Sequence, residues 1–325
     1  MQIHGQNRLR SLRLFGGRLL QNRTAFAFIA LGVILLIFGV LMPVSVSRGN
    51  LQSIFREASL LGLVALGQGI VMLAGGMDIS VGNIMFFMII YGGNLMQSDP
   101  NRFIPISLLC LALGSFIGLI NGLGVAKFKI SPIIMTLGTS SIIYGLIYIF
   151  GGAMMASPAP EPLQFIGKKS LFKLIPLTGL FWIGLTLVFV MVLYKTTLGR
   201  KIYAVGNNSK AAWLSGISSD SVLIVSYIIC DMLATLAGLL LLGYLGTPTL
   251  RFTDIYTMGS IAAVVIGGIE FFSGKGSIIG VVAGVIIVRF VFNVLVMMSV
   301  PEAGRMMIEG GMILAIVALY KIKSR

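Results

Sequence analysis

The residues with the most chemical potential are a few ionisable side chains that interrupt long apolar stretches: Asp78, Asp231, Arg289 and Glu309. Charges in such surroundings are costly, so they normally face water or a partner group. Asp231 and Arg289 lie at matching depths in two apolar stretches, which predicts a structural ion pair between them, with a substrate contact as the alternative. Glu309 follows Arg305 at helical spacing, which predicts a local ion pair.

Asp78 differs from the others because it lies in a glycine-rich break, AGGMDISVGN, at residues 74–83. Glycine permits backbone conformations that a helix excludes, and non-helical backbone at membrane depth is tolerated only beside protein or water. Discontinuous helices of this kind line the path of polar solutes in transporters. The alternative is a tight turn in which Asp78 caps the following helix. Both interpretations stay open, and the candidate pathway residues are Gly75, Gly76, Asp78, Ser80 and Asn83.

No set of residues predicts catalysis or metal binding. His4 is the single histidine and lies in a basic N-terminal stretch, and Cys110 and Cys230 lie in apolar runs, as buried thiols do. The stretch GGIEFFSGKGS, residues 267–277, fails as a phosphate-binding loop because Gly276 stands where a Ser or Thr is required. We therefore expect no enzyme activity, no cofactor and no metal in this chain, and any ATP would bind another subunit.

The composition places these residues in a lipid bilayer. Of 325 residues, 57% are hydrophobic and 10% are charged, and the mean hydropathy is +1.00. Because a spanning helix needs about 20 apolar residues, the sequence predicts an all-α integral membrane protein with about ten transmembrane helices. They cover 24–44, 56–75, 81–97, 103–126, 132–151, 177–194, 221–245, 256–270, 278–298 and 304–320. We expect a single transmembrane domain over 24–320, flanked by tails at 1–23 and 321–325.

The net charge of +14 arises from basic residues spread through short connectors and tails, a pattern typical of topology signals and not of a nucleic-acid surface. More of the 24 lysines and arginines fall on the side of the N-terminus, which predicts that both termini are cytoplasmic. The first apolar run is too long for a cleaved signal core, so we expect a retained helix. The connector 152–176 should be outside and the connector 195–220 inside.

Small residues recur at every fourth position in two of the apolar stretches. They are Gly114, Gly118 and Gly122 in one, and Gly280 and Gly284 in the other. This spacing lets helix backbones approach closely, so we interpret these glycines as packing residues.

The stretch GNNSKAAWLSGI, residues 206–217, predicts a short helix within the 195–220 connector. Asn208 or Ser209 can cap its start, and Gly216 can close it in the left-handed conformation. Its compact apolar surface would consist of Ala211, Ala212, Leu214 and Ile217. The alternative is a helix that lies on the inner membrane surface with Trp213 as its anchor.

Four stretches, taken together, resemble the permease subunits of ribose-type carbohydrate ABC importers, within the bacterial branched-chain amino acid and sugar permease superfamily. They are VALGQGIVMLAGGMDISVGNIM, KFKISPIIMTLGTSSIIYGLIYIFGG, TTLGRKIYAVGNNSKAAWLSGI and SIAAVVIGGIEFFSGKGSIIGVVAGVII. The resemblance covers roughly residues 50–320. The family's glycine, glycine, aspartate and serine signature falls on Gly75, Gly76, Asp78 and Ser80. Glu270, Phe271 and Phe272 depart from the small residues that the family often has there.

The resemblance implies an ABC importer permease fold that forms a dimer with a second copy or a paralogue in the bacterial inner membrane. It also implies a cytoplasmic ATP-binding subunit, which carries out ATP hydrolysis, and an extracytoplasmic solute-binding protein that delivers the solute. The helix that couples to the ATPase would comprise Ser209, Lys210, Ala211, Ala212, Trp213, Leu214, Ser215, Gly216 and Ile217.

The expected function is inward movement of a small polar solute, with a monosaccharide as the expected class, by a multi-pass permease driven by partner ATPases. The alternative is a proton-coupled secondary transporter in which Asp231 or Glu309 relays protons.

Overall fold

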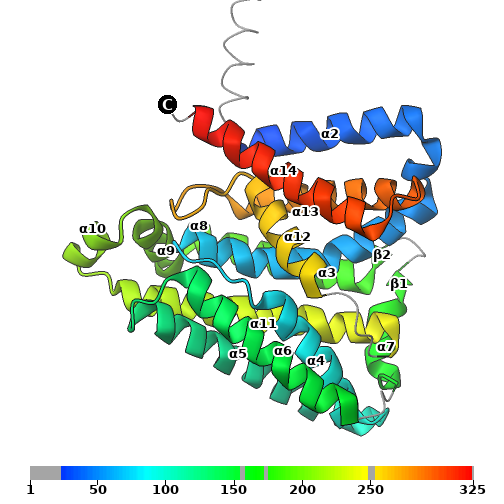
Figure 1. Ribbon diagram of the computed structural model, residues 1–325, viewed down its shortest axis with the longest axis horizontal. Helices are drawn as coiled ribbons and strands as arrows, with labels where there is room; N and C mark the ends of the chain where they lie inside the picture. The colour runs from blue at the N-terminus through cyan, green and yellow to red at the C-terminus, as the bar shows by residue number, and fades with distance from the viewer. Residues whose placement is uncertain (1–22, 154–157, 172–174, 248–252, 324–325) are drawn as a thin grey trace, which may run out of the picture.

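The computed structural model describes residues 23–323 apart from 154–157, 172–174 and 248–252, and this part is almost entirely helical (Figure 1). The helices of the first half are α2 (Arg23–Leu41), η1 (Pro43–Val46), α3 (Arg48–Leu73), α4 (Val81–Met96), η2 (Pro100–Arg102), α5 (Phe103–Ala126) and α6 (Pro132–Ala153). There follow α7 (Glu161–Lys168), β1 (Ser170–Leu171), β2 (Ile175–Pro176), α8 (Leu177–Lys195), α9 (Thr197–Asn207), α10 (Ser209–Leu214), α11 (Ser219–Leu245), α12 (Thr253–Ile266), α13 (Ile278–Met297) and α14 (Glu302–Lys323).

The described part contains seven helices that are long and apolar enough to cross a membrane, and two shorter apolar helices that correspond to α4 and α12. Every segment predicted to span the bilayer coincides with a helix of the structure, and α14 is the last of them. The chain is therefore a multi-pass, all-α membrane protein. The number of complete crossings stays a prediction.

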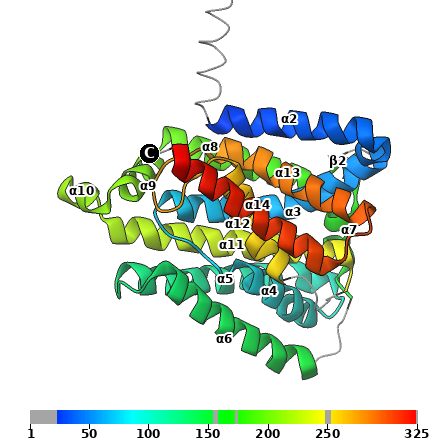
Figure 2. The same ribbon diagram turned by 45° about the horizontal axis from the view of Figure 1, so that its top comes forward.

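The helices lie roughly side by side and give the molecule two distinct ends (Figures 1 and 2). One end carries α9 and α10, and the start of α2 and the end of α14 lie toward it; we call it the α10 end. The other carries α7 and the small antiparallel pair of β1 and β2, and we call it the α7 end. The predicted connector 195–220 thus lies at the end opposite the described residues of the predicted connector 152–176, which are 152–153, 158–171 and 175–176.

The core is centred on α3 and α11. Every residue of α3 from Ala58 to Leu73 is buried, and α11 packs against α3, α4, α5 and α7. By contrast, 6% of the apolar window of α2 is buried inside the protein. A helix that is buried all round belongs to the core, whereas an apolar helix that is mostly uncovered by protein faces lipid, so α2 is peripheral.

Glycines make the contact between α5 and α11 possible, as their spacing predicts. A Cβ added at Gly118 would lie 2.6 Å from the carbonyl oxygen of Tyr227, and one at Gly122 would lie 2.7 Å from the Cα of Ile224. On α13, Gly280 and Gly284 lie against the backbone of residues 263–267 in the same way. The close packing inferred from the fourfold spacing is confirmed for both helices.

Candidate functional site

The glycine-rich break between α3 and α4 is an extended segment. Gly75 has a φ of +88°, which a residue with a side chain rarely adopts, and this turns the chain out of α3. The Asp78 Oδ1 atom accepts hydrogen bonds from the Ser80 backbone amide at 2.7 Å and from the Ser80 hydroxyl at 2.6 Å. These bonds fix the start of α4 at Val81. Ser80 is the N-cap residue of α4 and no side chain caps this helix, so Asp78 orders the turn that precedes α4 but does not cap α4 as the alternative supposed.

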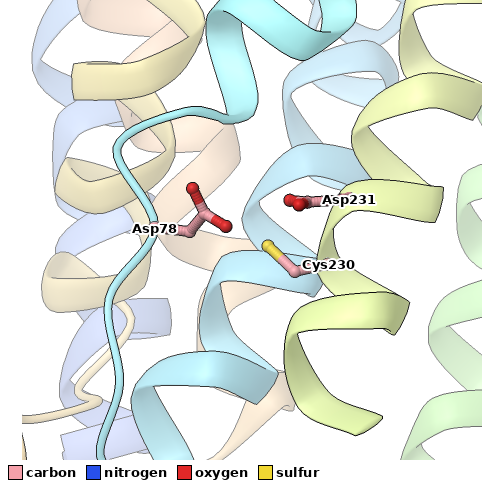
Figure 3. Close-up of side chains that lie close together, drawn as sticks. All are labelled: Asp78, Cys230 and Asp231. Atoms are coloured by element: carbon pink, nitrogen blue, oxygen red, sulfur yellow. The ribbon is translucent and has the colours of Figure 1, made fainter. Parts of the chain in front are cut away.

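The same carboxylate belongs to a buried polar cluster that joins four separate segments, the break, α5, α6 and α11. The Asn121 amide, from α5, donates to Asp78 Oδ2 at 3.4 Å, to the Ser80 hydroxyl at 3.1 Å and to Asp231 Oδ2 at 3.2 Å. The Thr139 hydroxyl, from α6, donates to Asn121 Oδ1 at 2.6 Å. Figure 3 shows the Asp78 and Asp231 carboxylates pointing toward one another from the break and from α11. We call these residues the Asn121 cluster.

Further polar contacts hold the break along its length. The Tyr227 hydroxyl, from α11, donates to the Met77 carbonyl at 3.0 Å and accepts from the Met77 amide at 3.3 Å. The Ile79 amide donates to the Thr136 hydroxyl at 3.1 Å. A segment without a helix's own hydrogen bonds needs such partners in an apolar environment. The sequence did not reveal them, because Asn121, Thr136 and Tyr227 lie far from the break in the chain.

The predicted pathway residues differ in how enclosed they are. Asp78 and Ser80 are 0% exposed, whereas Asn83 is half-buried and donates to the Ser140 hydroxyl at 2.7 Å. In this conformation the side chains of Asp78 and Ser80 are therefore enclosed by protein, and Asn83 is the polar side chain of this stretch that lies nearest to the surface.

The cluster also brings Cys230 near the two carboxylates, with one ligand atom from each of Asp78, Cys230 and Asp231 within 4.8 Å of one another. Hard cations such as Mg²⁺ or Ca²⁺ take six or more oxygen ligands, usually including water. Here all three residues are fully buried, and Asn121 and Ser80 already donate to the carboxylates. The arrangement is better explained as a hydrogen-bonded contact that holds the segments together than as a cation site.

The predicted ion pair between Asp231 and Arg289 is wrong. Among the described residues no ion pair joins them. Asp231 faces Asn121, whereas the Arg289 guanidinium lies over the Tyr256 ring, 4.9 Å from its centroid. The reason is the position of α3, which packs against both α11 and α13 and lies between them (Figure 1).

The local pair predicted for Glu309 is wrong as well. No ion pair between Arg305 and Glu309 occurs in the described part of the chain. The Arg305 guanidinium lies 4.7 Å from the centroid of the Phe292 ring, and Glu309 is 7% exposed. Helical spacing brought the two residues to one face of α14, but an aromatic ring on α13 competes successfully for the cation.

The short helix predicted in the 195–220 connector is α10, and it projects from the α10 end of the molecule (Figure 1). Asn208 Oδ1 accepts from the Ala211 amide at 2.9 Å, and Gly216 has a φ of +80°. Both predicted end signals are therefore confirmed. Trp213 and Leu214 are 66% and 71% exposed, which leaves a large apolar surface at the tip.

The prediction for Ala212 is wrong. From the sequence, Ala212 was expected on the exposed apolar surface of this helix. It is buried and belongs to the hydrophobic core of the chain itself. The amide of Ile217 donates to the Ala212 carbonyl at 3.0 Å, which closes the helix over it. A partner can therefore reach Trp213 and Leu214 but not Ala212.

A tight series of contacts links α10 to the break. Gly206, near the end of α9, lies so close to the backbone carbonyl of Leu73 that a Cβ there would overlap it. Leu73 is the last residue of α3, directly before the break. On the other side, the Ser219 hydroxyl, at the start of α11, donates to the Ser209 carbonyl at 3.0 Å. The exposed tip is thus joined by short contacts to both α3 and α11.

The glycine-rich loop 267–277 packs beside α9. The Tyr203 hydroxyl donates to the Gly276 carbonyl at 3.3 Å, and the hydroxyls of Tyr194 and Ser277 lie 2.8 Å apart. Glu270 forms an ion pair with Arg23 at the start of α2. Glu270, which departs from the family pattern, therefore has a structural partner in Arg23 that was not predicted from the sequence.

Comparisons with known proteins agree with the arrangement of the helices. The family model described as "Branched-chain amino acid transport system / permease component" matches residues 50–317. The galactose/methyl galactoside import permease protein MglC of Salmonella typhimurium is 33% identical over 316 residues, which cover 91% of this chain and 93% of that protein.

Two further relatives have similar coverage. The ribose import permease protein RbsC of Bacillus subtilis is 31% identical over 299 residues, 91% of this chain and 92% of that protein. The autoinducer 2 import system permease protein LsrC of Photorhabdus luminescens is 32% identical over 303 residues, 92% of this chain and 90% of that protein. No solved structure matches the chain.

Proposed function

Because the chain belongs to the branched-chain amino acid transport system permease component family, we propose that it forms the membrane path of an ATP-driven importer for a monosaccharide or a sugar-like solute. Relatives that match nine-tenths of its length are import permeases for galactose, ribose and autoinducer 2. ATP hydrolysis would take place on a separate cytoplasmic subunit, and an extracytoplasmic binding protein would deliver the solute. A proton-coupled secondary transporter is not favoured by these relatives.

The proposal assigns the α10 end to the cytoplasm of a bacterium, with the permease in its inner membrane. Both tails, 1–23 and 321–325, would lie on that side, and residues 24–320 would form a single transmembrane domain that pairs with a second copy or a paralogue. The start of α2 and the end of α14 lie toward α10, which supports this topology (Figure 2).

The observation that carries the proposal is the exposed apolar tip of α10, Trp213 and Leu214. A tip that projects from the bundle fits a groove in a cytoplasmic ATPase better than it fits a membrane surface. When the ATPase moves, α10 and α9 would move with it, and α9 lies directly on the end of α3. Motion would thereby reach the break and the Asn121 cluster, where an enclosed polar segment can open toward one side or the other.

Within this proposal the path passes along the break. Asn83 would contact the solute as it passes, and Gly75 and Gly76 would permit the backbone change that opens the path. Asp78 and Ser80 would hold the closed arrangement through Asn121. This division of roles follows from the burial of Asp78 and Ser80 and the partial exposure of Asn83.

The test introduces a charge at the tip of α10. Leu214→Glu should abolish ATPase association and solute uptake, because a carboxylate cannot enter an apolar groove, while the amount of folded permease in the membrane stays unchanged. Leu171→Glu is the matched control, because Leu171 lies on β1 at the α7 end and is 38% exposed. This variant should leave ATPase association intact. Co-purification of the ATPase with each variant is the measurement, and normal co-purification with Leu214→Glu would reject the proposal.

A further inference from the structure

An apolar groove opens beside α2 in the half of the molecule nearer the α7 end. Its volume is about 580 Å³, and its walls come from α2, η1, α3, β2 and α13. Leu35 lines it from α2, Arg48, Gln52 and Ala58 line it from α3, and Ile286 lines it from α13. Nine of the eleven lining residues are apolar, so the groove offers almost no partner for water.

The packing of α2 explains why the space exists. This helix packs on α13 and on η1, and the groove lies between it and residues 48–58 of α3. A small cluster of Ile54, Phe290 and Val294 fills the inner side of the gap. The remaining space faces the lipid phase, because almost none of α2 is covered by protein.

The two polar residues of the groove lie at its end nearer the membrane surface. Arg48 is the first residue of α3 and is exposed. In the described part of the chain it takes part in no ion pair. Gln52, one turn further along α3, donates to the Ser170 hydroxyl at 2.9 Å, which fixes the position of its amide. The groove therefore combines one free cation at its mouth with an apolar interior.

The length of the groove matches one leaflet of a bilayer. Arg48 and Ala58 both line it and are separated by about 15 Å of helix rise. The hydrocarbon layer is about 30 Å thick, so each leaflet contributes about 15 Å. A molecule that fits must therefore have an anionic head at the level of Arg48 and an apolar chain that reaches the middle of the membrane.

We propose that this groove binds a phospholipid of the leaflet at the α7 end, with one acyl chain between α2 and α3 and its phosphate against Arg48. Lipid tails are as apolar as the lining, so burial of the chain does not by itself select this place over the surrounding bilayer. Selection comes from the charge of Arg48 and from the shape of the walls. The bound lipid would fill the gap that separates α2 from the core.

The test measures retained phosphatidylglycerol by native mass spectrometry of the permease purified in mild detergent with that lipid added. Leu35→Trp fills the groove from α2 and should remove the bound lipid. Leu36→Trp is the matched control, because Leu36 is 71% exposed and does not line the groove. Arg48→Gln should lower the occupancy roughly fivefold, the usual upper range for one exposed ion pair. Lys169→Gln, a cation at the same end, should leave it unchanged.

A second variant, Ile286→Phe, fills the groove from α13 and should also remove the lipid. Because this change is not on α2, loss of lipid in both variants cannot be due to displacement of α2 alone. Equal retention in Leu35→Trp, Ile286→Phe and Leu36→Trp would overturn the proposal. Equal retention in Arg48→Gln and Lys169→Gln would overturn the role of the phosphate. The test does not depend on transport, so its failure would leave the proposed function untouched.

Discussion

At the scale of single residues, Asn121 has the most connections in the described part of the polar core. Its amide donates to Asp78, Ser80 and Asp231, and its carbonyl accepts from Thr139. A buried carboxylate that loses its donor keeps the full cost of its desolvation. The cluster therefore depends on one neutral side chain of α5 that satisfies partners from three other segments, namely the break, α6 and α11.

Asn121→Leu keeps the approximate volume of the side chain but removes every one of these hydrogen bonds. We expect a loss of about 1–3 kcal/mol in stability, the usual cost of leaving a buried polar group without its hydrogen bond. Fluorescence-detected thermal unfolding of the detergent-solubilised protein is the measurement. Asn101→Leu, an exposed asparagine in η2, should unfold at the wild-type temperature. Equal midpoints for the two variants would show that the cluster contributes nothing to stability.

At the same scale, the glycines of α5 distinguish close packing from open space. Gly118→Ala places a methyl group 2.6 Å from the Tyr227 carbonyl oxygen, so α5 and α11 must separate. Overpacking of this kind costs typically about 1–3 kcal/mol. Gly138→Ala on α6 is the control, because nothing lies within 4 Å of the added Cβ, and alanine is the better helix former.

The measurements are the amount of folded protein in the membrane and the unfolding temperature. Both should be lower than wild type for Gly118→Ala, and both should equal or exceed wild type for Gly138→Ala. If both variants behave alike, the contact between α5 and α11 is looser than the structure indicates.

At the scale of elements, α10 is a short helix whose two ends are both specified. A helix of this length has little cooperativity of its own, so the cap bond from Asn208 to the Ala211 amide has a large share in keeping it formed. The burial of Ala212 beneath the helix supplies the rest. The tip with Trp213 and Leu214 stays in place only while both contributions persist.

Asn208→Ala should therefore raise the amide hydrogen exchange of residues 209–214, because loss of a cap costs about 1 kcal/mol, or roughly a fivefold increase in opening. Asn207→Ala changes the neighbouring exposed asparagine, whose side chain makes no such cap bond, and should leave exchange unchanged. Hydrogen exchange with mass spectrometry can resolve this peptide. Unchanged exchange in Asn208→Ala would mean that packing alone holds α10.

At the scale of the whole molecule, the two ends of the bundle are chemically different. The α10 end gathers the start of α2, the end of α14, α9 and the loop 267–277. It also carries Lys127 and Lys129, which pair with Asp220. The α7 end carries the small strands and the groove beside α2. Basic residues favour the cytoplasmic side, so the α10 end should be inside.

A reporter fused after Arg325 should be active only as a cytoplasmic reporter, and a fusion in the connector 152–176 only as an extracytoplasmic one. The control is a fusion in the connector 195–220, which should behave like the C-terminal fusion. A C-terminus found outside would mean that one of the apolar helices, with the short α12 as the first suspect, does not cross the membrane.

The sequence by itself determined the positions of the membrane helices, the class of protein and several local features. The apolar runs coincide with helices, because the bilayer sets their length and leaves the backbone little alternative. The capping of α10 by Asn208, its closure at Gly216 and the glycine contacts of α5 were also predicted correctly. These features depend on residues close together in the chain, or on backbone space that glycine alone provides.

Only the tertiary structure decided which side chains meet. Asp231 and Arg289 have matching depths, yet α3 lies between their helices, and Ala212 turned inward although its neighbours Trp213 and Leu214 are exposed. The physical reason is that a membrane helix surrounded by lipid and by apolar neighbours is apolar on every face. Its sequence therefore determines how deep each residue lies in the membrane, but not which neighbouring helix the side chain faces. The Asn121 cluster and the groove beside α2 both depend on that rotation, and so only the assembled bundle reveals them.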